Sequence, residues 1–148
     1  MSNKLKNTKI YVGSQNCHEN ENFGPSTGSV NSKMLKSVGA SYVIIGHSEV
    51  RQRGETNNLI NKKIKAAIKS GLKIIFCVGE TLKEKRGKLT KKVLSKQINL
   101  GLNEIRNKSN IIVAYEPVWS IGTGVIPKNN ELYETINFLK RKIKKNKI

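Results

Sequence analysis

Four short apolar runs recur along the chain at nearly even intervals. They cover residues 10–13, 42–46, 74–79 and 111–115, with starts about 31 to 37 residues apart. The three later runs are apolar without alternation, which is typical of parallel strands buried on both faces. Since the connections between them are far longer than a hairpin loop, the pattern predicts repeated strand–helix units.

Between these runs lie segments whose apolar residues recur with the period of an amphipathic helix. They cover 59–68, 94–105 and 132–143, and Gly71 follows the first as a C-terminal cap. A shorter helix is expected over 31–38. The chain therefore alternates strand and helix through four units.

Four parallel units leave two architectures open. A doubly wound sheet carries helices on both faces, whereas an arc of a (β/α)8 barrel has two open edges. A complete barrel of that kind usually takes about 250 residues, and this chain has 148. We expect one domain over 1–148, because no linker or low-complexity stretch divides the units.

Composition excludes several classes of protein. No apolar run approaches a membrane span, and the N-terminus lacks the apolar centre of a signal peptide, so we expect a cytoplasmic protein and no membrane partner. Cys17 and Cys77 are far apart and form no CxxC pair, and with only 2 His the sequence predicts no metal site.

The formal charge of +18 raises nucleic-acid binding as a possible function. Lys supplies most of the 28 basic residues, however, and these are spread over every predicted helix and linker instead of forming one stripe. Few Arg and few aromatic residues leave little for base readout or stacking. We expect weak, salt-sensitive contact with polyanions and no specific nucleic-acid partner.

Polar side chains follow each predicted strand at its carboxyl end, where parallel α/β folds gather their functional groups. They are Gln15, Asn16, His47, Ser48, Glu49, Glu80 and Glu116.

Two of these side chains, His47 and Glu116, suit acid–base chemistry. Ser48 is a good helix N-cap residue, so we expect the imidazole of His47 near a helix start, where the helix dipole favours a neutral ring. A neutral imidazole can donate a hydrogen bond to developing negative charge, and Glu116 can act as a general base. The pair suits proton abstraction next to a carbonyl. The alternative is that both side chains are structural.

The segment after the fourth run holds the sole Trp and two spaced glycines. Pro117 cannot donate a ladder hydrogen bond and restricts Glu116 to extended backbone, so the strand is expected to end there. Gly122 and Gly124 can adopt backbone angles closed to other residues, which suits a loop that opens and closes. The alternative is an ordinary strand-to-helix connection. Neither nucleotide-binding loop pattern is complete, which disfavours a nucleotide cofactor.

Several stretches together resemble the triosephosphate isomerase family. The stretch 42–49 is similar to that family's histidine signature, and 77–80 is similar to its next strand end. The stretch 114–124 resembles its catalytic glutamate and flexible lid. The matches come in family order and at family spacing over nearly the whole chain.

Thr27 and Gly28, with the stretch 15–17, resemble the loop that reaches the partner subunit in the family's dimer, which implies a homodimer. Ser29 stands where the family usually has Glu, and Val50 stands where it usually has Arg. Because those two residues tend to pair near the dimer loop in that family, the resemblance does not extend to this interface contact.

The resemblance implies interconversion of dihydroxyacetone phosphate and glyceraldehyde 3-phosphate through an enediolate, a step of glycolysis and gluconeogenesis that needs no metal or organic cofactor. Glu116 would move the proton between the two carbons, and neutral His47 would act at the oxygens, an arrangement already known for this family. Ser48 would hold Glu116 in its resting position.

The resemblance also assigns the lid. Pro117 and Gly124 would be its hinge residues, Trp119 would belong to its body, and the amide of Gly122 would contact the substrate phosphate when the lid closes.

The similarity starts just before the family's third strand and ends in the helix after its sixth. It therefore implies a middle section of the barrel, and a single incomplete TIM-barrel domain over 1–148. The family's Asn-x-Lys and its later phosphate-binding segments have no counterpart in the matched residues. The alternative function is an inactive fragment or assembly module of that enzyme.

Overall fold

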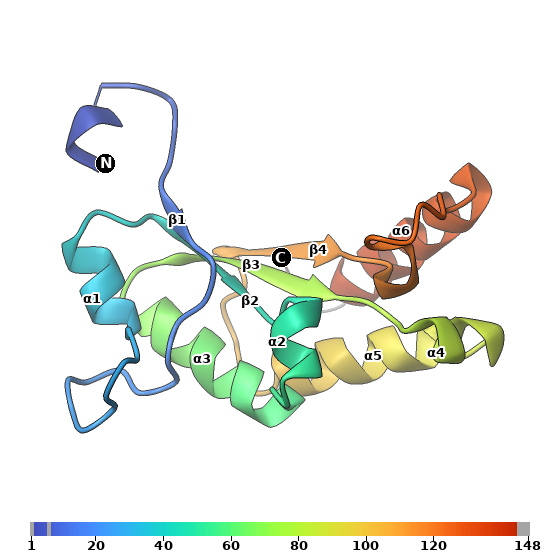
Figure 1. Ribbon diagram of the computed structural model, residues 1–148, viewed down its shortest axis with the longest axis horizontal. Coiled ribbons are helices and arrows are strands. Elements are labelled where there is room, and N and C mark those ends of the chain that lie inside the picture. The colour runs from blue at the N-terminus through green and yellow to red at the C-terminus, as the bar shows by residue number, and fades with distance from the viewer. Residues whose placement is uncertain (1, 6, 145–148) are drawn as a thin grey trace.

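The computed structural model describes residues 2–5 and 7–144, and its centre is a four-stranded parallel sheet (Figure 1). The strands lie side by side in chain order, and each pairs in parallel with the next. This order has no reversal point, unlike a doubly wound sheet, and it is the order of a barrel arc. The strands are β1 (Gly13–Ser14), β2 (Tyr42–Ile45), β3 (Lys73–Val78) and β4 (Ile111–Tyr115).

At least one helix follows each strand. The helices are η1 (Ser2–Leu5), α1 (Ser32–Ser37), α2 (Ser48–Gln52), α3 (Asn57–Lys69), α4 (Leu82–Arg86), α5 (Thr90–Gly101), η2 (Val118–Ser120) and α6 (Asn129–Lys144), where η denotes a 3-10 helix. The predicted helical segments correspond to α1, α3, α5 and α6.

The ends of α3 show why this helix begins and stops where it does. The side chain of Thr56 accepts a hydrogen bond from the amide of Leu59, and Gly71 follows the helix at a φ of 73°. The predicted stripe over 94–105 runs past the end of α5 at Gly101, although Leu102 and Ile105 stay buried.

The predicted first strand over 10–13 is wrong in its bounds, because only Gly13 and Ser14 form a ladder. Ile10 and Tyr11 are 62% and 65% exposed. The backbone carbonyl of Val12 still accepts a bond from the amide of Ser41 at 2.8 Å. As an edge strand, β1 has a ladder partner on one side only among the described residues, so its apolar residues gain less by joining the sheet.

One face of the sheet carries the core. Val43, Ile45, Ile74 and Phe76 are fully buried under α3 and α5, and Figure 1 shows α1, α3 and α5 along one side of the strands. The alternating side chains on the other face are covered much less, and Ile112 is 54% exposed. Helices on a single face confirm the partial-barrel prediction.

The described residues also bear on what the composition predicts about membrane spans, metal sites and cysteines. None of the helices in the described ranges is long and apolar enough to cross a membrane. The described side chains form no group of three or more that could hold a metal ion. Cys17 and Cys77 are free and buried.

Candidate active site

The carboxyl ends of β2, β3 and β4 bring three of the predicted polar side chains to one end of the sheet. His47 follows β2, Glu80 follows β3 and Glu116 follows β4. The register pairs Val78 with Tyr115, and the amide of Glu116 continues the ladder by donating to the carbonyl of Val78 at 2.9 Å. The sheet therefore fixes the backbone of Glu116.

His47, and not Ser48 as predicted, is the N-cap residue of α2. The Nδ1 atom of His47 accepts a hydrogen bond from the amide of Glu49 at 3.3 Å, and Ser48 is the first helical residue. The imidazole thus lies at the helix start, where it was expected. Because Nδ1 accepts a hydrogen bond from this amide, a neutral ring carries its proton on Nε2, which can then act as a donor.

The carboxylate of Glu116 reaches this imidazole. Oε1 of Glu116 lies 2.8 Å from Nε2 of His47, and Oε2 accepts a bond from the backbone amide of Ser48 at 3.0 Å. The two side chains are partly exposed, at 34% for His47 and 19% for Glu116. Both oxygens of one carboxylate are therefore in contact with nitrogen atoms at the start of α2.

Gly79 allows the backbone of Glu116 to lie very close to the end of β3. A Cβ atom on Gly79 would lie 1.8 Å from the carbonyl oxygen of Glu116 and 3.4 Å from the side chain of Val118. Real Cβ atoms do not approach this closely, so a glycine is required at the end of β3 by packing. The position of Glu116 depends on this close contact between two strand ends.

Arg51 lies beneath the site, and the sequence patterns did not single it out. Its guanidinium donates to the carbonyls of Gly46 at 2.6 Å and Cys77 at 3.0 Å, and to Oδ1 of Asn57 at 2.8 Å. Burial lowers the pKa of Arg51, and the charges of nearby groups oppose this change. The side chain ties the ends of β2 and β3 together. The available signal was the rarity of Arg in a chain so rich in Lys.

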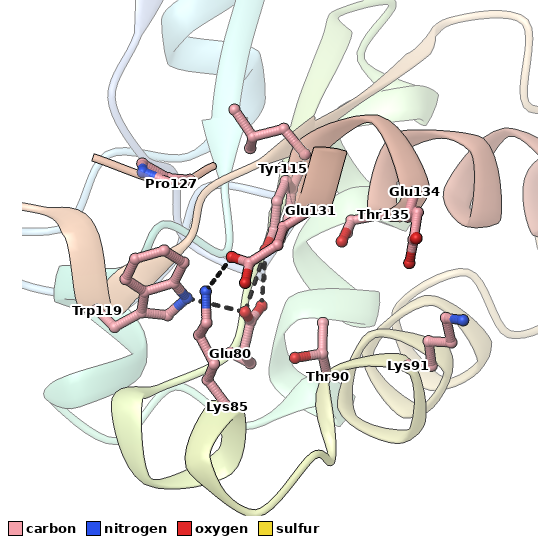
Figure 2. A pocket seen from close by; sticks show the side chains of 11 residues that line it. Glu80, Lys85, Thr90, Lys91, Tyr115, Trp119, Pro127, Glu131, Glu134 and Thr135 are labelled. Atoms are coloured by element: carbon pink, nitrogen blue, oxygen red, sulfur yellow. Dashed lines mark hydrogen bonds and ion pairs between the residues drawn. The ribbon is translucent and has the colours of Figure 1, made fainter. Parts of the chain in front are cut away.

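Glu80 receives two donor groups, which make three hydrogen-bond contacts beside the site (Figure 2). The Tyr115 hydroxyl lies 3.1 Å from each carboxylate oxygen, and Nε1 of Trp119 donates at 2.9 Å. Glu80 is only 1% exposed, so these neutral donors replace water around its carboxylate. Burial raises the pKa of Tyr115, and the Glu80 carboxylate raises it further.

The predicted lid leaves the sheet at Pro117, which precedes η2, and passes through Trp119 before reaching α6. Gly122 and Gly124 have φ values of 68° and 71°, which favour glycine, and added Cβ atoms would meet nothing within 4 Å. The hydroxyl of Thr123 donates to the carbonyl of Trp119 at 3.0 Å. Trp119 is buried and the tip of the lid is not, as the exposed side chains Ile121, Val125 and Ile126 show.

Within the part of the chain that the structure describes, no hydrogen bond or ion pair joins the residues of the predicted dimer loop to His47 or Glu116. The side-chain amide of Asn16 donates to Glu55 at 3.0 Å and its Oδ1 accepts from Lys63 at 3.2 Å. Thr27 and Gly28 lie in an exposed loop with Phe23 near its tip. This loop is therefore a surface feature.

The sequence is similar to known proteins over nearly its whole length. The sequence model of one protein family, described as triosephosphate isomerase, matches residues 1–147. The chain is 45% identical over 141 residues to a triosephosphate isomerase of Thermodesulfovibrio yellowstonii, which covers 95% of this chain and 57% of that protein. It is 43% identical over 144 residues to one of Clostridium botulinum, which covers 95% of this chain and 58% of that protein.

The fold is similar as well. The crystal structure of triosephosphate isomerase from Bartonella henselae superposes with a TM-score of 0.85 at 38% sequence identity. The match covers 95% of this chain and 56% of that one. The chain therefore spans a little more than half the length of the relatives that it matches.

Proposed function

The chain belongs to the triosephosphate isomerase family, and on that premise we propose that it carries the proton-transfer pair for interconverting dihydroxyacetone phosphate and glyceraldehyde 3-phosphate. The observation that supports this most is the 2.8 Å contact between Nε2 of His47 and Oε1 of Glu116, at the carboxyl ends of β2 and β4. A carboxylate base beside a neutral imidazole donor suits proton transfer next to a carbonyl.

Glu116 takes a proton from one carbon of the substrate and returns it to the neighbouring carbon. As the enediolate forms, negative charge builds on the two oxygens, and the Nε2–H of His47 donates to them. Substrate must enter between the two side chains, so the carboxylate first leaves Nε2 and the amide of Ser48. This one movement frees both the donor and the base.

The lid has a protective part in this reaction. Gly122 and Gly124 allow the segment to swing, and the amide of Gly122 contacts the substrate phosphate when the lid is closed. Pro117 and Gly124 act as hinge residues, while Trp119 belongs to the body of the lid. Exclusion of water by the closed lid prevents side reactions of the enediolate.

The finer features of the proposal concern assembly and location. The domain is a single incomplete TIM barrel over 1–148 that forms a homodimer through the exposed loop with Thr27 and Gly28. The protein is cytoplasmic and has no specific nucleic-acid partner. Exposure of Phe23 beside Thr27 supports a contact role for this loop, since an isolated aromatic side chain at a loop tip gains from burial.

The test is turnover of glyceraldehyde 3-phosphate. The purified chain is assayed alone and mixed with a second chain that carries the remaining strand–helix units of the Thermodesulfovibrio yellowstonii relative. We expect activity that falls by about 10²–10⁴ in Glu116→Gln and is unchanged in Glu104→Gln, which alters an exposed glutamate. No turnover in either sample, with the chain folded, would overturn the proposal, as would full activity in Glu116→Gln.

A further inference from the structure

Lys85 of α4 lies against both flanks of the lid (Figure 2). Its ammonium nitrogen is 3.5 Å from the centroid of the Trp119 ring and 2.6 Å from Oε2 of Glu131. Trp119 lies in the first part of the lid, close to the hinge residue Pro117, and Glu131 lies after the lid in the first turn of α6. A single cation thus contacts the chain near both ends of the lid.

We propose that Lys85 is a positioning residue that fastens both ends of the lid and thereby limits how far the lid moves. This inference rests on the proposed function in one respect, that the segment 117–124 is the lid over the substrate. Lys85 itself does not touch the reacting atoms.

The cation–π contact of Lys85 with Trp119 restrains the indole ring in a way that its hydrogen bond to Glu80 does not. The hydrogen bond from Nε1 of Trp119 to Glu80 is made at the edge of the indole ring. The ammonium of Lys85 lies over the face of the ring, and rotation would break this cation–π contact. The two contacts together fix the position and the tilt of the indole.

Helix α4 provides a firm support for Lys85. Thr81 and Glu84 form a capping box, in which the hydroxyl of Thr81 accepts from the amide of Glu84 and Oε2 of Glu84 accepts from the amide of Thr81 at 2.8 Å. The amide of Lys85 donates to the carbonyl of Thr81 at 2.9 Å. The lysine stem therefore starts from an ordered backbone that does not belong to the lid.

An ordinary surface ion pair is the simpler explanation, since exposed pairs usually contribute little. Lys65 and Glu104 provide the comparison within this chain: they lie 2.7 Å apart with side chains 36% and 73% exposed. Lys85 and Glu131 are 29% and 50% exposed and border a pocket of about 220 Å³ that also contains Glu80 and Trp119. Less water around the cation strengthens its contact with the ring.

The sole Trp of the chain makes this restraint measurable. Quenching of its fluorescence by acrylamide reports only on Trp119. We expect Lys85→Met, which keeps the apolar stem, to raise the quenching constant by about two- to fivefold. Lys85→Arg keeps the cation and should restore the native value, and Lys65→Met is the matched control that should leave it unchanged.

Hydrogen exchange gives the corresponding measurement for the lid. We expect amides of the segment 121–126 to exchange faster in Lys85→Met and, to a smaller extent, in Glu131→Gln, which releases only the α6 end. Lys65→Met and Glu104→Gln should not change these rates.

Native quenching and native lid exchange in a folded Lys85→Met protein would overturn the inference. Should that variant not fold, native lid exchange in folded Glu131→Gln would overturn it instead. Neither measurement uses turnover. A chain that lacks isomerase activity but shows both effects would therefore contradict the proposed function and leave the role of Lys85 intact.

Discussion

Nε2 of His47 and Oε1 of Glu116 lie 2.8 Å apart, so the proposed electrophile and the proposed base are in direct contact. The second carboxylate oxygen is bound by the amide of Ser48, one residue after the imidazole. The start of α2 therefore supplies both donors to Glu116. A shift of this short helix would displace the electrophile and the resting position of the base together.

His47→Asn separates the capping role of His47 from its proposed chemical role. Asn is a good N-cap residue and can still accept the bond from the amide of Glu49, but it lacks the Nε2 donor. We expect turnover to fall by about 10²–10⁴, with little change in the thermal midpoint. His18→Asn is the control, because His18 lies in a loop and bonds to the amide of Asn20. Unchanged turnover in His47→Asn would exclude His47 as the electrophile.

Gly79→Ala should be strongly destabilising for its size. The new Cβ atom would lie 1.8 Å from the carbonyl oxygen of Glu116, so one of the two strand ends must move. We expect a loss of about 1–3 kcal/mol or more in the free energy of unfolding, measured with urea. Gly24→Ala, where nothing lies within 4 Å, is the matched control. Equal stability of the two variants would refute the close contact.

Arg51→Met should weaken the junction between β2 and β3. The carbonyls of Gly46 and Cys77 would lose their donors, and we expect a cost of about 2–4 kcal/mol in the free energy of unfolding. Arg51→Lys should recover only part of this, because Lys lacks the planar fork that reaches several acceptors at once. Arg53→Lys alters an exposed neighbour and serves as the control. A native unfolding curve for Arg51→Met would contradict this account.

The free energy of unfolding should decrease as the pH rises above the ordinary pKa of a thiol. Burial raises the pKa of Cys17 and of Cys77 from 9.0 to about 11. Between these values the unfolded chain releases the thiol protons and the folded chain keeps them. The contribution to stability is therefore full below pH 9.0 and is lost as pH rises towards 11.

Urea unfolding below and above this window measures the effect. The double variant Cys17→Ala with Cys77→Ala should show a smaller decrease than the parent chain, because other groups titrate equally in both. Parallel decreases in the two proteins would show that the thiols do not contribute.

Much of the fold followed from the sequence because burial leaves a periodic pattern. The runs at 42–46, 74–79 and 111–115 overlap β2, β3 and β4, and the helical stripes overlap α3, α5 and α6. The pattern failed at 10–13, where apolar residues lie at an exposed edge. Apolar side chains at these positions favour burial. A strand forms only where a neighbouring strand is placed to pair with it.

The supporting residues of the site could not be predicted in this way. Gly79 is required by a contact with Glu116 far along the chain, and Arg51 bonds to carbonyls at the ends of two separate strands. Glu80 was placed at a strand end, but its bonds to Tyr115 and Trp119 depend on how β3 and β4 align. Such requirements arise from tertiary contacts and leave no period in the sequence.

The two faces of the sheet also differ in how freely their residues can change over evolutionary time. Val43, Ile74 and Phe76 fit a helix layer that is already complete, so each substitution there must fit fixed neighbours. Ile75 and Ile112 are register partners on the opposite face, and Ile112 is 54% exposed, so a substitution there meets fewer fixed neighbours. Lineages of this protein are therefore expected to vary more at every second strand position than at the positions under the helices.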